Sequence, residues 1–254
     1  MAKAKAPFTI IGTIDDLNFY DSADGNIVRM RGKTGITKQQ FKDNPIFDPI
    51  RQQGSDFGYC SKKAKTFNLL VKPFYRYSQG ASLFGRCIQL LLAILNEDAE
   101  NEKGSRSLIK GLQNKTGLNY LLGFEGNTER PLSTVLLHDI TFDWNKLELN
   151  LKELDPINDI AWPESATQVS IQLAIANWNC EEDRFVTSYS TIQVIDKKSG
   201  ILSLSFDLIP PTEKHLWLCF IHFRFCYTLY NKVKVLHNRY NTTTSIGMKA
   251  FYKT

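Results

Sequence analysis

The feature that most constrains the fold is a change of hydrophobic period near Gly123. Beyond it, apolar and polar side chains alternate, as where serines separate Leu202, Leu204 and Phe206. Successive side chains of a strand point to opposite faces, so this alternation predicts strands with one buried face. The segments with this pattern are 136–144, 147–151, 169–178, 185–195, 201–209, 216–230 and 232–237. Polar turns separate them, which predicts an antiparallel β-sandwich with immunoglobulin-like proportions over residues 124–254.

The longest of these segments, 216–230, is expected to be a central strand. Trp217, Ile221 and Phe225 lie on one face together with other large apolar residues, and the second face begins apolar and ends polar. The segment contains His222 and Arg224 and is shorter than the roughly 20 apolar residues that a membrane-spanning helix needs. We therefore expect a strand here and no membrane span.

Residues 1–117 have a different pattern, which predicts a β-hairpin followed by helices. Asp24-Gly25 lies between two β-prone runs and is a strong hairpin signal. Thr37 predicts the start of a first helical turn, which Pro45 stops. The fold class expected for the chain is thus α+β, with one domain over 1–117 and a second over 124–254.

The helices are expected from apolar residues at three- and four-residue steps. This spacing predicts an amphipathic helix over 46–78, a second helix over 82–95 and a shorter one over 105–113. With 43% apolar residues among 254, the chain has enough to build a core.

Several motifs resemble a group of Bacteroidota proteins with no assigned activity. The motifs are 12–20 (GTIDDLNFY), 24–29 (DGNIVR), 44–51 (NPIFDPIR), 54–58 (GSDFG), 156–163 (PINDIAWP) and 166–169 (ATQV). The chain differs from the group at Asp15, where glycine is usual, and at Asp21, where lysine is usual. The resemblance spans most of the chain, but it implies no functional residues because the group has no known activity.

The chain lacks the common sequence signatures of nucleotide-binding, zinc-protease and hydrolase sites. His215 and His222 are seven residues apart around one strand, so their side chains are expected on opposite faces, where they cannot share a metal. The five cysteines have no Cys-x-x-Cys spacing and are expected to be free buried thiols. We therefore expect no enzyme, with no catalytic residue, no cofactor and no metal site.

Charge permits one alternative function, the binding of nucleic acid. The net charge of +5 comes from residues 1–117, which hold 18 Lys+Arg and 11 Asp+Glu, against 13 and 15 in residues 118–254. Cations and aromatic residues alternate in the predicted front helix, where they could contact phosphates and stack on bases. The candidate residues are Lys62, Lys63, Lys65, Lys72 and Arg76. The opposing interpretation is that the aromatic residues fill the core and the lysines are a solvated face.

The leading hypothesis is a non-enzymatic scaffold that associates with copies of itself. The hairpin strand could add to the edge of a neighbouring sheet, and the glycines of 54–58 could let two chains approach closely. The candidate self-association residues are Ile14, Leu17, Phe19, Tyr20, Gly54, Phe57 and Gly58. A less favoured alternative is a small-ligand site in loops around Trp162 and Trp178. Residues 1–7 lead into too short an apolar run for a signal peptide, so a cytoplasmic location is expected.

Overall fold

A computed structural model describes residues 2–3, 9–22, 25–32, 35–80, 82–230 and 232–251. The chain divides into two compact units, Met1–Asp48 and Pro49–Thr254, called here the N-terminal and C-terminal units. This division does not coincide with the boundary between residues 117 and 124 that the sequence predicts. The reason is the packing of the helices, described below.

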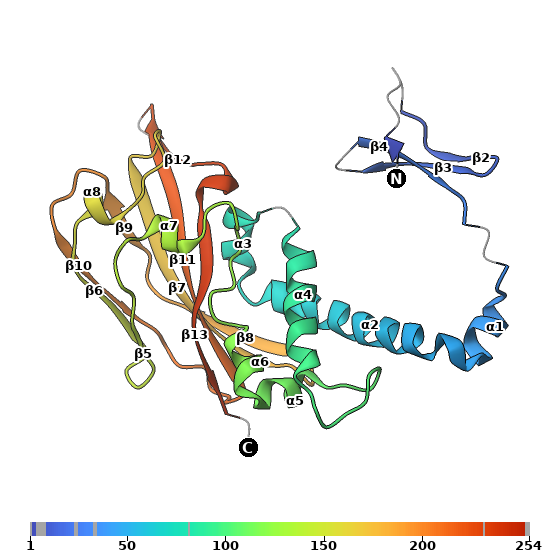
Figure 1. The fold of residues 1–254 in the computed structure, drawn as a ribbon. Helices are drawn as coiled ribbons and strands as arrows, with labels where there is room; N and C mark the ends of the chain where they lie inside the picture. Colours follow the sequence, from blue (N-terminus) through green and yellow to red (C-terminus); the bar gives the residue numbers. More distant parts are fainter. Residues whose placement is uncertain are drawn as a thin grey trace. The chain divides into compact units, whose positions relative to one another are not determined.

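The N-terminal unit contains a four-stranded antiparallel sheet in the order β1-β4-β3-β2 (Figure 1). Its strands are β1 (Ala2–Lys3), β2 (Gly12–Ile14), β3 (Leu17–Ser22) and β4 (Gly25–Met30). The pairing of β3 with β4 confirms the expected hairpin, although Ala23 and Asp24 of its turn lie outside the described residues. Asp15, with φ of 50°, and Asp16 form the turn between β2 and β3.

A short helical segment follows this sheet. In α1 (Lys38–Asp43), the Thr37 hydroxyl accepts a hydrogen bond from Gln40 N–H, and the Gln40 side chain accepts one from Thr37 N–H. This reciprocal capping box starts the helix where the sequence predicts. The 3-10 helix η1 (Pro45–Phe47) comes after it.

A six-stranded antiparallel sheet lies at the centre of the C-terminal unit. Strand β11 pairs with β7 on one side and with β12 and β13 on the other, and this confirms that it is central. The expected strand over 185–195 is two strands, β8 and β9, and β13 was not expected. The bounds are β7 (Gln168–Asn179), β8 (Arg184–Tyr189), β9 (Gln193–Asp196), β11 (Leu216–Leu229), β12 (Lys232–Val235) and β13 (Thr242–Ala250).

A three-stranded sheet packs on one face of the six-stranded sheet. It contains β5 (Phe142–Asp143), β6 (Glu148–Leu154) and β10 (Leu202–Asp207). Leu151 and Phe206 lie in one core with Ile171 and Phe223 of the larger sheet. The expected strand over 136–144 is wrong in extent, since α7 (Leu132–Val135) precedes it and only β5 is extended. A further short helix, α8 (Pro156–Asp159), follows β6. The antiparallel sheets and helices confirm the α+β class, while immunoglobulin-like proportions stay a prediction.

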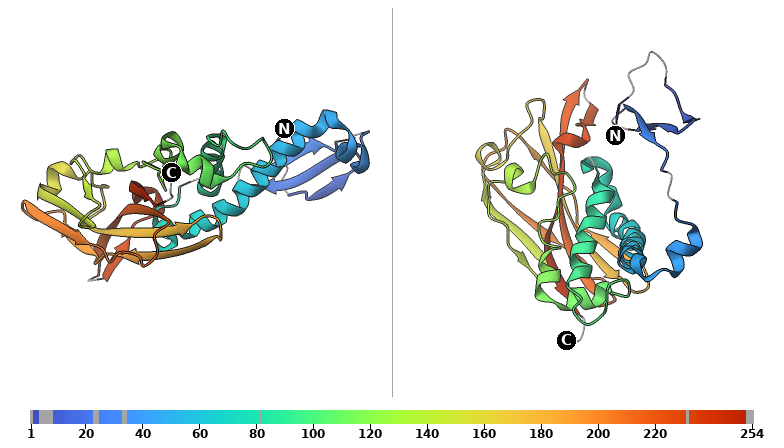
Figure 2. Two further views of the ribbon diagram at one scale, coloured as in Figure 1. Left: turned by 90° about the horizontal axis from the view of Figure 1, so that it is seen from below. Right: turned by 45° about the vertical axis from the view of Figure 1, so that its right-hand side comes forward.

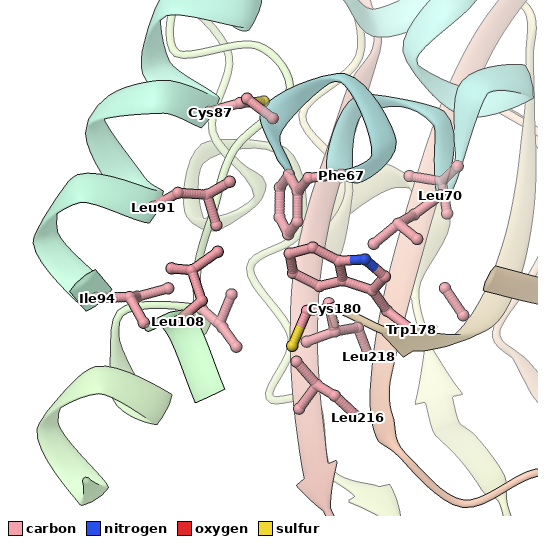
Figure 3. Packing of buried hydrophobic residues seen from close by; sticks show 14 of the residues in the cluster. Phe67, Leu70, Cys87, Leu91, Ile94, Leu108, Trp178, Cys180, Leu216 and Leu218 are labelled. Atoms are coloured by element: carbon pink, nitrogen blue, oxygen red, sulfur yellow. The ribbon is translucent and has the colours of Figure 1, made fainter. Parts of the chain in front are cut away.

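Helices cover the other face of the six-stranded sheet (Figure 2). They are α2 (Asp48–Leu69), α3 (Lys72–Ser78), α4 (Leu83–Asn96), α5 (Leu108–Gln113) and α6 (Lys115–Asn119). Phe67 packs edge-to-face on Trp178 of β7, with ring centroids 5.7 Å apart, and Leu91 and Leu218 lie in the same core (Figure 3). These helices therefore share one core with the sheet and do not form a separate domain.

The helix expected over 46–78 is interrupted at residues 70–71, between α2 and α3. Pro73 lies in the first turn of α3. In a continuous helix its ring would clash with the Leu69 carbonyl, and it has no N–H to donate. A proline in the first turn of a new helix avoids both costs, which explains the break.

Candidate interaction surfaces

The thiols of the C-terminal unit are buried parts of the core. Among the described residues, no cluster of three or more His, Cys, Asp or Glu side chains could hold a metal. All five cysteines are buried, and burial raises the pKa of the Cys60 and Cys87 thiols to about 12. No helix in the described part of the chain is long and apolar enough to cross a membrane.

His222 is likewise a core residue. Its ring stacks on Phe74 with centroids 4.8 Å apart, and Nδ1 lies 3.0 Å from the Thr242 carbonyl oxygen. Burial lowers the pKa of His222 to about 3, despite the hydrogen bond to Thr242, so the imidazole is neutral near pH 7. Neutral Nδ1–H then donates to Thr242. His222 therefore has a structural role, in which it joins β11 to β13 and α3.

The sheet of the N-terminal unit has one apolar face that remains exposed. The strand register pairs Ile14 with Leu17 and Leu17 with Met30, which places all three on one face. Phe19 and Val28 are paired on the same face. Exposed fractions are 53% for Ile14, 39% for Leu17 and 75% for Met30, and no described residue of β2, β3 or β4 is buried. These five residues are called the apolar sheet face.

The opposite face of this sheet is mixed, with Thr13, Asn18 and Arg29 next to the paired Tyr20 and Ile27. The Thr13 hydroxyl donates to Asn18 Oδ1 at 2.6 Å, and the Arg29 guanidinium lies 5.6 Å from the centre of the Tyr20 ring. Three expected self-association residues, Ile14, Leu17 and Phe19, thus share the apolar sheet face. Tyr20 does not join them, because adjacent residues of a strand point to opposite faces.

A second exposed apolar region lies in the C-terminal unit, in a groove of about 670 Å³ between α2, α4 and the loop after α4. The groove contains two of the expected residues, Gly54 and Phe57. Phe57 is 51% exposed and Ile50 is 56% exposed. The full lining, called the α2–α4 groove, is Pro49, Ile50, Gln53, Gly54, Asp56, Phe57, Leu92, Asn96, Lys103 and Arg106.

Hydrogen bonds hold the loop that forms one wall of this groove. Asp56 Oδ1 accepts from Gly104 N–H at 3.0 Å, and the Ser55 hydroxyl donates to the Gly104 carbonyl oxygen at 3.0 Å. Asp98 is buried and accepts from the Asn101 side-chain amide at 2.8 Å and from several backbone N–H groups, including that of Ser107 at 2.8 Å. Burial raises the Asp98 pKa, but these hydrogen bonds outweigh burial and the pKa is lowered. The groove is therefore formed before any partner binds.

The two glycines of the GSDFG motif lie on α2 one helical turn apart. A Cβ added at Gly54 or Gly58 would meet no described atom within 4 Å. Glycine inside a helix costs about 1 kcal/mol relative to alanine, and packing within the described chain does not explain either residue. The face of α2 at Gly54 is thus open to a close backbone approach.

The expected nucleic-acid residues do not form one exposed basic surface. Lys63 is buried, its Nζ lies 3.1 Å from an Asp183 carboxylate oxygen, and it donates to the Glu181 carbonyl oxygen at 3.0 Å. Lys62, Lys65, Lys72 and Arg76 are exposed. Of the five aromatic residues that could stack on bases, Phe67, Phe74 and Tyr75 are buried in the core, and Tyr59 and Tyr77 are partly exposed. This arrangement favours the core interpretation of the aromatic residues.

The small-ligand site expected in the loops around Trp162 and Trp178 is not supported by the positions of these two residues. Trp178 is fully buried between the helices and the sheet, so it lines no loop site. Trp162 donates from Nε1 to the Pro156 carbonyl oxygen at 2.6 Å and packs edge-to-face on Phe225. The indole rings of both tryptophans therefore pack against other side chains of the protein.

No family model, curated protein or solved structure matches this chain. The resemblance to the Bacteroidota group therefore stays a prediction from the motifs.

Sequence reasoning missed Val28 and Met30 of the apolar sheet face and every lining residue of the α2–α4 groove except Gly54 and Phe57. Val28 and Met30 follow from the hairpin register, because the partners of Phe19 and Leu17 can be counted outward from the turn. Lys103 and Arg106 had no usable signal. They reach the groove only because the loop folds back onto Asp56 and Ser55.

Proposed function

We propose that this chain is a non-enzymatic structural protein that assembles with copies of itself through its N-terminal unit. The observation that carries the proposal is the apolar sheet face. An isolated small sheet needs to bury one face to be stable in water, and large apolar patches on soluble proteins mark interaction sites. Burial of Leu17, Ile14 and Met30 would contribute on the order of several kcal/mol.

The location of the apolar residues supports assembly more than ligand binding. Ile14, Leu17 and Met30 lie side by side on a sheet surface. A sheet face of this kind suits a macromolecular partner with a matching apolar surface. Every copy of the chain carries the same surfaces, so a second copy is a partner that is always present at the same concentration as the first.

The proposal is tested by the mass of the full chain in solution. Light scattering on nuclease-treated protein should show a mass above 29.0 kDa that rises with protein concentration. Leu17→Asp should lower it toward the monomer, because a carboxylate would have to be buried in the interface. Asn18→Asp is the matched control, with the same added charge one residue away on the opposite face of the sheet. A wild-type chain that stays monomeric at every concentration overturns the proposal.

A further inference from the structure

We infer that the apolar sheet face of one copy docks in the α2–α4 groove of a neighbouring copy, so that copies join head to tail. This inference rests on the proposed function and specifies its geometry. It commits to a second copy as the occupant of the groove. Two surfaces of the same chain, each exposed in its own unit, supply the two halves of the contact.

The first half of the contact is the end of the sheet at the β2–β3 turn. Ile14 and Leu17 flank this turn on the apolar sheet face, and Asp15 and Asp16 lie between them. Asp15 is exposed, and the Arg31 N–H donates to the Asp16 carbonyl oxygen, which ties the turn to the end of β4. The turn therefore presents the exposed Asp15 carboxylate beside two apolar side chains.

The groove offers the complementary chemistry. Ile50, Phe57 and Leu92 supply apolar contact, and Lys103 and Arg106 add two cations. Its one lining carboxylate, Asp56, accepts the hydrogen bond from Gly104 N–H and keeps its negative charge, so the two cations leave the groove one net positive charge. A volume of about 670 Å³ lies within the range of roughly 300–1,000 Å³ that is usual for binding pockets.

Charge favours this cross-pairing over pairing of like surfaces. If two sheet faces met turn to turn, the carboxylates of both copies would approach one another. If two grooves met, Lys103 and Arg106 of both copies would do so. Like charges that face each other across an interface disfavour the pairing of those two surfaces. Opposite charges favour the pairing and fix its register. Cross-pairing places Asp15 near Lys103 and Arg106.

The open face of α2 at Gly54 supports the same contact. An added Cβ there would meet no described atom within 4 Å, although Gly54 lines the groove. A glycine at this position lets the backbone of an incoming strand approach α2 closely. Because the two surfaces differ, the interface is heterologous, and repetition of it forms a ring or an open filament.

The test mixes two variants that each lack one half of the contact. Leu17→Asp disables the sheet face and keeps the groove, and Phe57→Asp disables the groove and keeps the sheet face. Each alone should remain monomeric at concentrations where the wild type assembles, with a dissociation constant raised at least about tenfold. An equimolar mixture should form a dimer and stop there, because only one intact pair of surfaces remains.

The outcomes separate the inference from the proposed function. A mixture that stays monomeric, or a Phe57→Asp chain that assembles as well as the wild type, overturns head-to-tail docking but leaves self-association standing. A monomeric wild type overturns the proposed function itself. If Leu17→Asp no longer shows the circular dichroism spectrum of the folded chain, Met30→Asp takes its place. If Phe57→Asp no longer shows it, Ile50→Asp takes its place.

Discussion

Leu17 on β3 and Met30 on β4 lie directly opposite each other on one face of the N-terminal sheet, and both are exposed. Cross-strand neighbours of this kind usually contribute to a buried core. Here, nothing in the described part of the N-terminal unit covers them. The pair therefore leaves an apolar sheet surface exposed, and the proposed self-association rests on that surface.

Neutralising Asp15 should weaken assembly in a salt-dependent way. Asp15→Asn keeps a residue that tolerates the positive φ of 50° but removes a carboxylate that cross-pairing places near Lys103 and Arg106. We expect the dissociation constant to rise several-fold at low salt and to depend less on salt than in the wild type. Light scattering over a salt series measures both. Asp21→Asn is the control, and equal effects of the two substitutions would contradict a role for the turn.

The two glycines of α2 should behave differently when replaced by alanine. Gly54→Ala and Gly58→Ala should each stabilise the folded chain by up to about 1 kcal/mol, because alanine favours a helix and neither Cβ meets a described atom. Urea unfolding at low protein concentration measures this gain. Only Gly54 lines the groove, so only Gly54→Ala should also weaken assembly. Unchanged assembly would show that no backbone approaches α2 at this point.

Lys63 should contribute to the stability of the fold and not to the binding of a partner. Lys63→Met removes the contact with Asp183 and the hydrogen bond to the Glu181 carbonyl oxygen. We expect the free energy of unfolding to fall by about 1–2 kcal/mol. Lys62→Met, at an exposed neighbour, should leave it within about 0.5 kcal/mol of the wild type. Equal stability of the two variants in urea unfolding would refute this assignment.

His222 should make the C-terminal unit less stable as the pH falls. Its pKa is about 3 when folded and 6.5 as an ordinary histidine, so between these values the unfolded chain binds a proton that the folded chain does not. The free energy of unfolding therefore decreases as pH falls through this window, by up to about 1.4 kcal/mol per unit from this residue.

Replacing the histidine isolates this contribution. His222→Gln should be less stable at pH 7, where the ring stack on Phe74 is lost, but should depend less on pH between 6.5 and 3. Urea unfolding at several pH values measures the difference, with the exposed His237→Gln as control. Parallel curves for His222→Gln and the wild type would contradict a buried neutral imidazole.

The helices and the sheet should unfold together. A fragment of residues 124–254 would expose the helix-facing side of the sheet, including Trp178, Leu218 and Phe220. We expect it to aggregate or remain unfolded, whereas residues 49–254 should unfold in one transition. Circular dichroism and tryptophan fluorescence measure both. A soluble, folded 124–254 fragment would restore the domain boundary expected from the sequence.

Local signals in the sequence determined several elements correctly. Asp24-Gly25 between β-prone runs predicts the pairing of β3 and β4, and the Thr37 capping box predicts the start of α1. The apolar residues of 216–230 predict the central strand β11. These succeed because turns, caps and strand periodicity depend on residues close together in the chain. The residues of the apolar sheet face follow from the same local register.

The remaining features depend on contacts between residues far apart in the chain. Strand β13 begins with polar residues, and these are buried because partners distant in sequence satisfy them, as when the Thr244 hydroxyl donates to a Glu125 carboxylate oxygen. The helices join the sheet because the second face of β7 needs Phe67 and its neighbours to cover Trp178. The α2–α4 groove exists because Asp56 holds a loop that begins about forty residues later in the chain. Such long-range contacts are chosen by burial and hydrogen bonding in three dimensions, and no local pattern of residues specifies them.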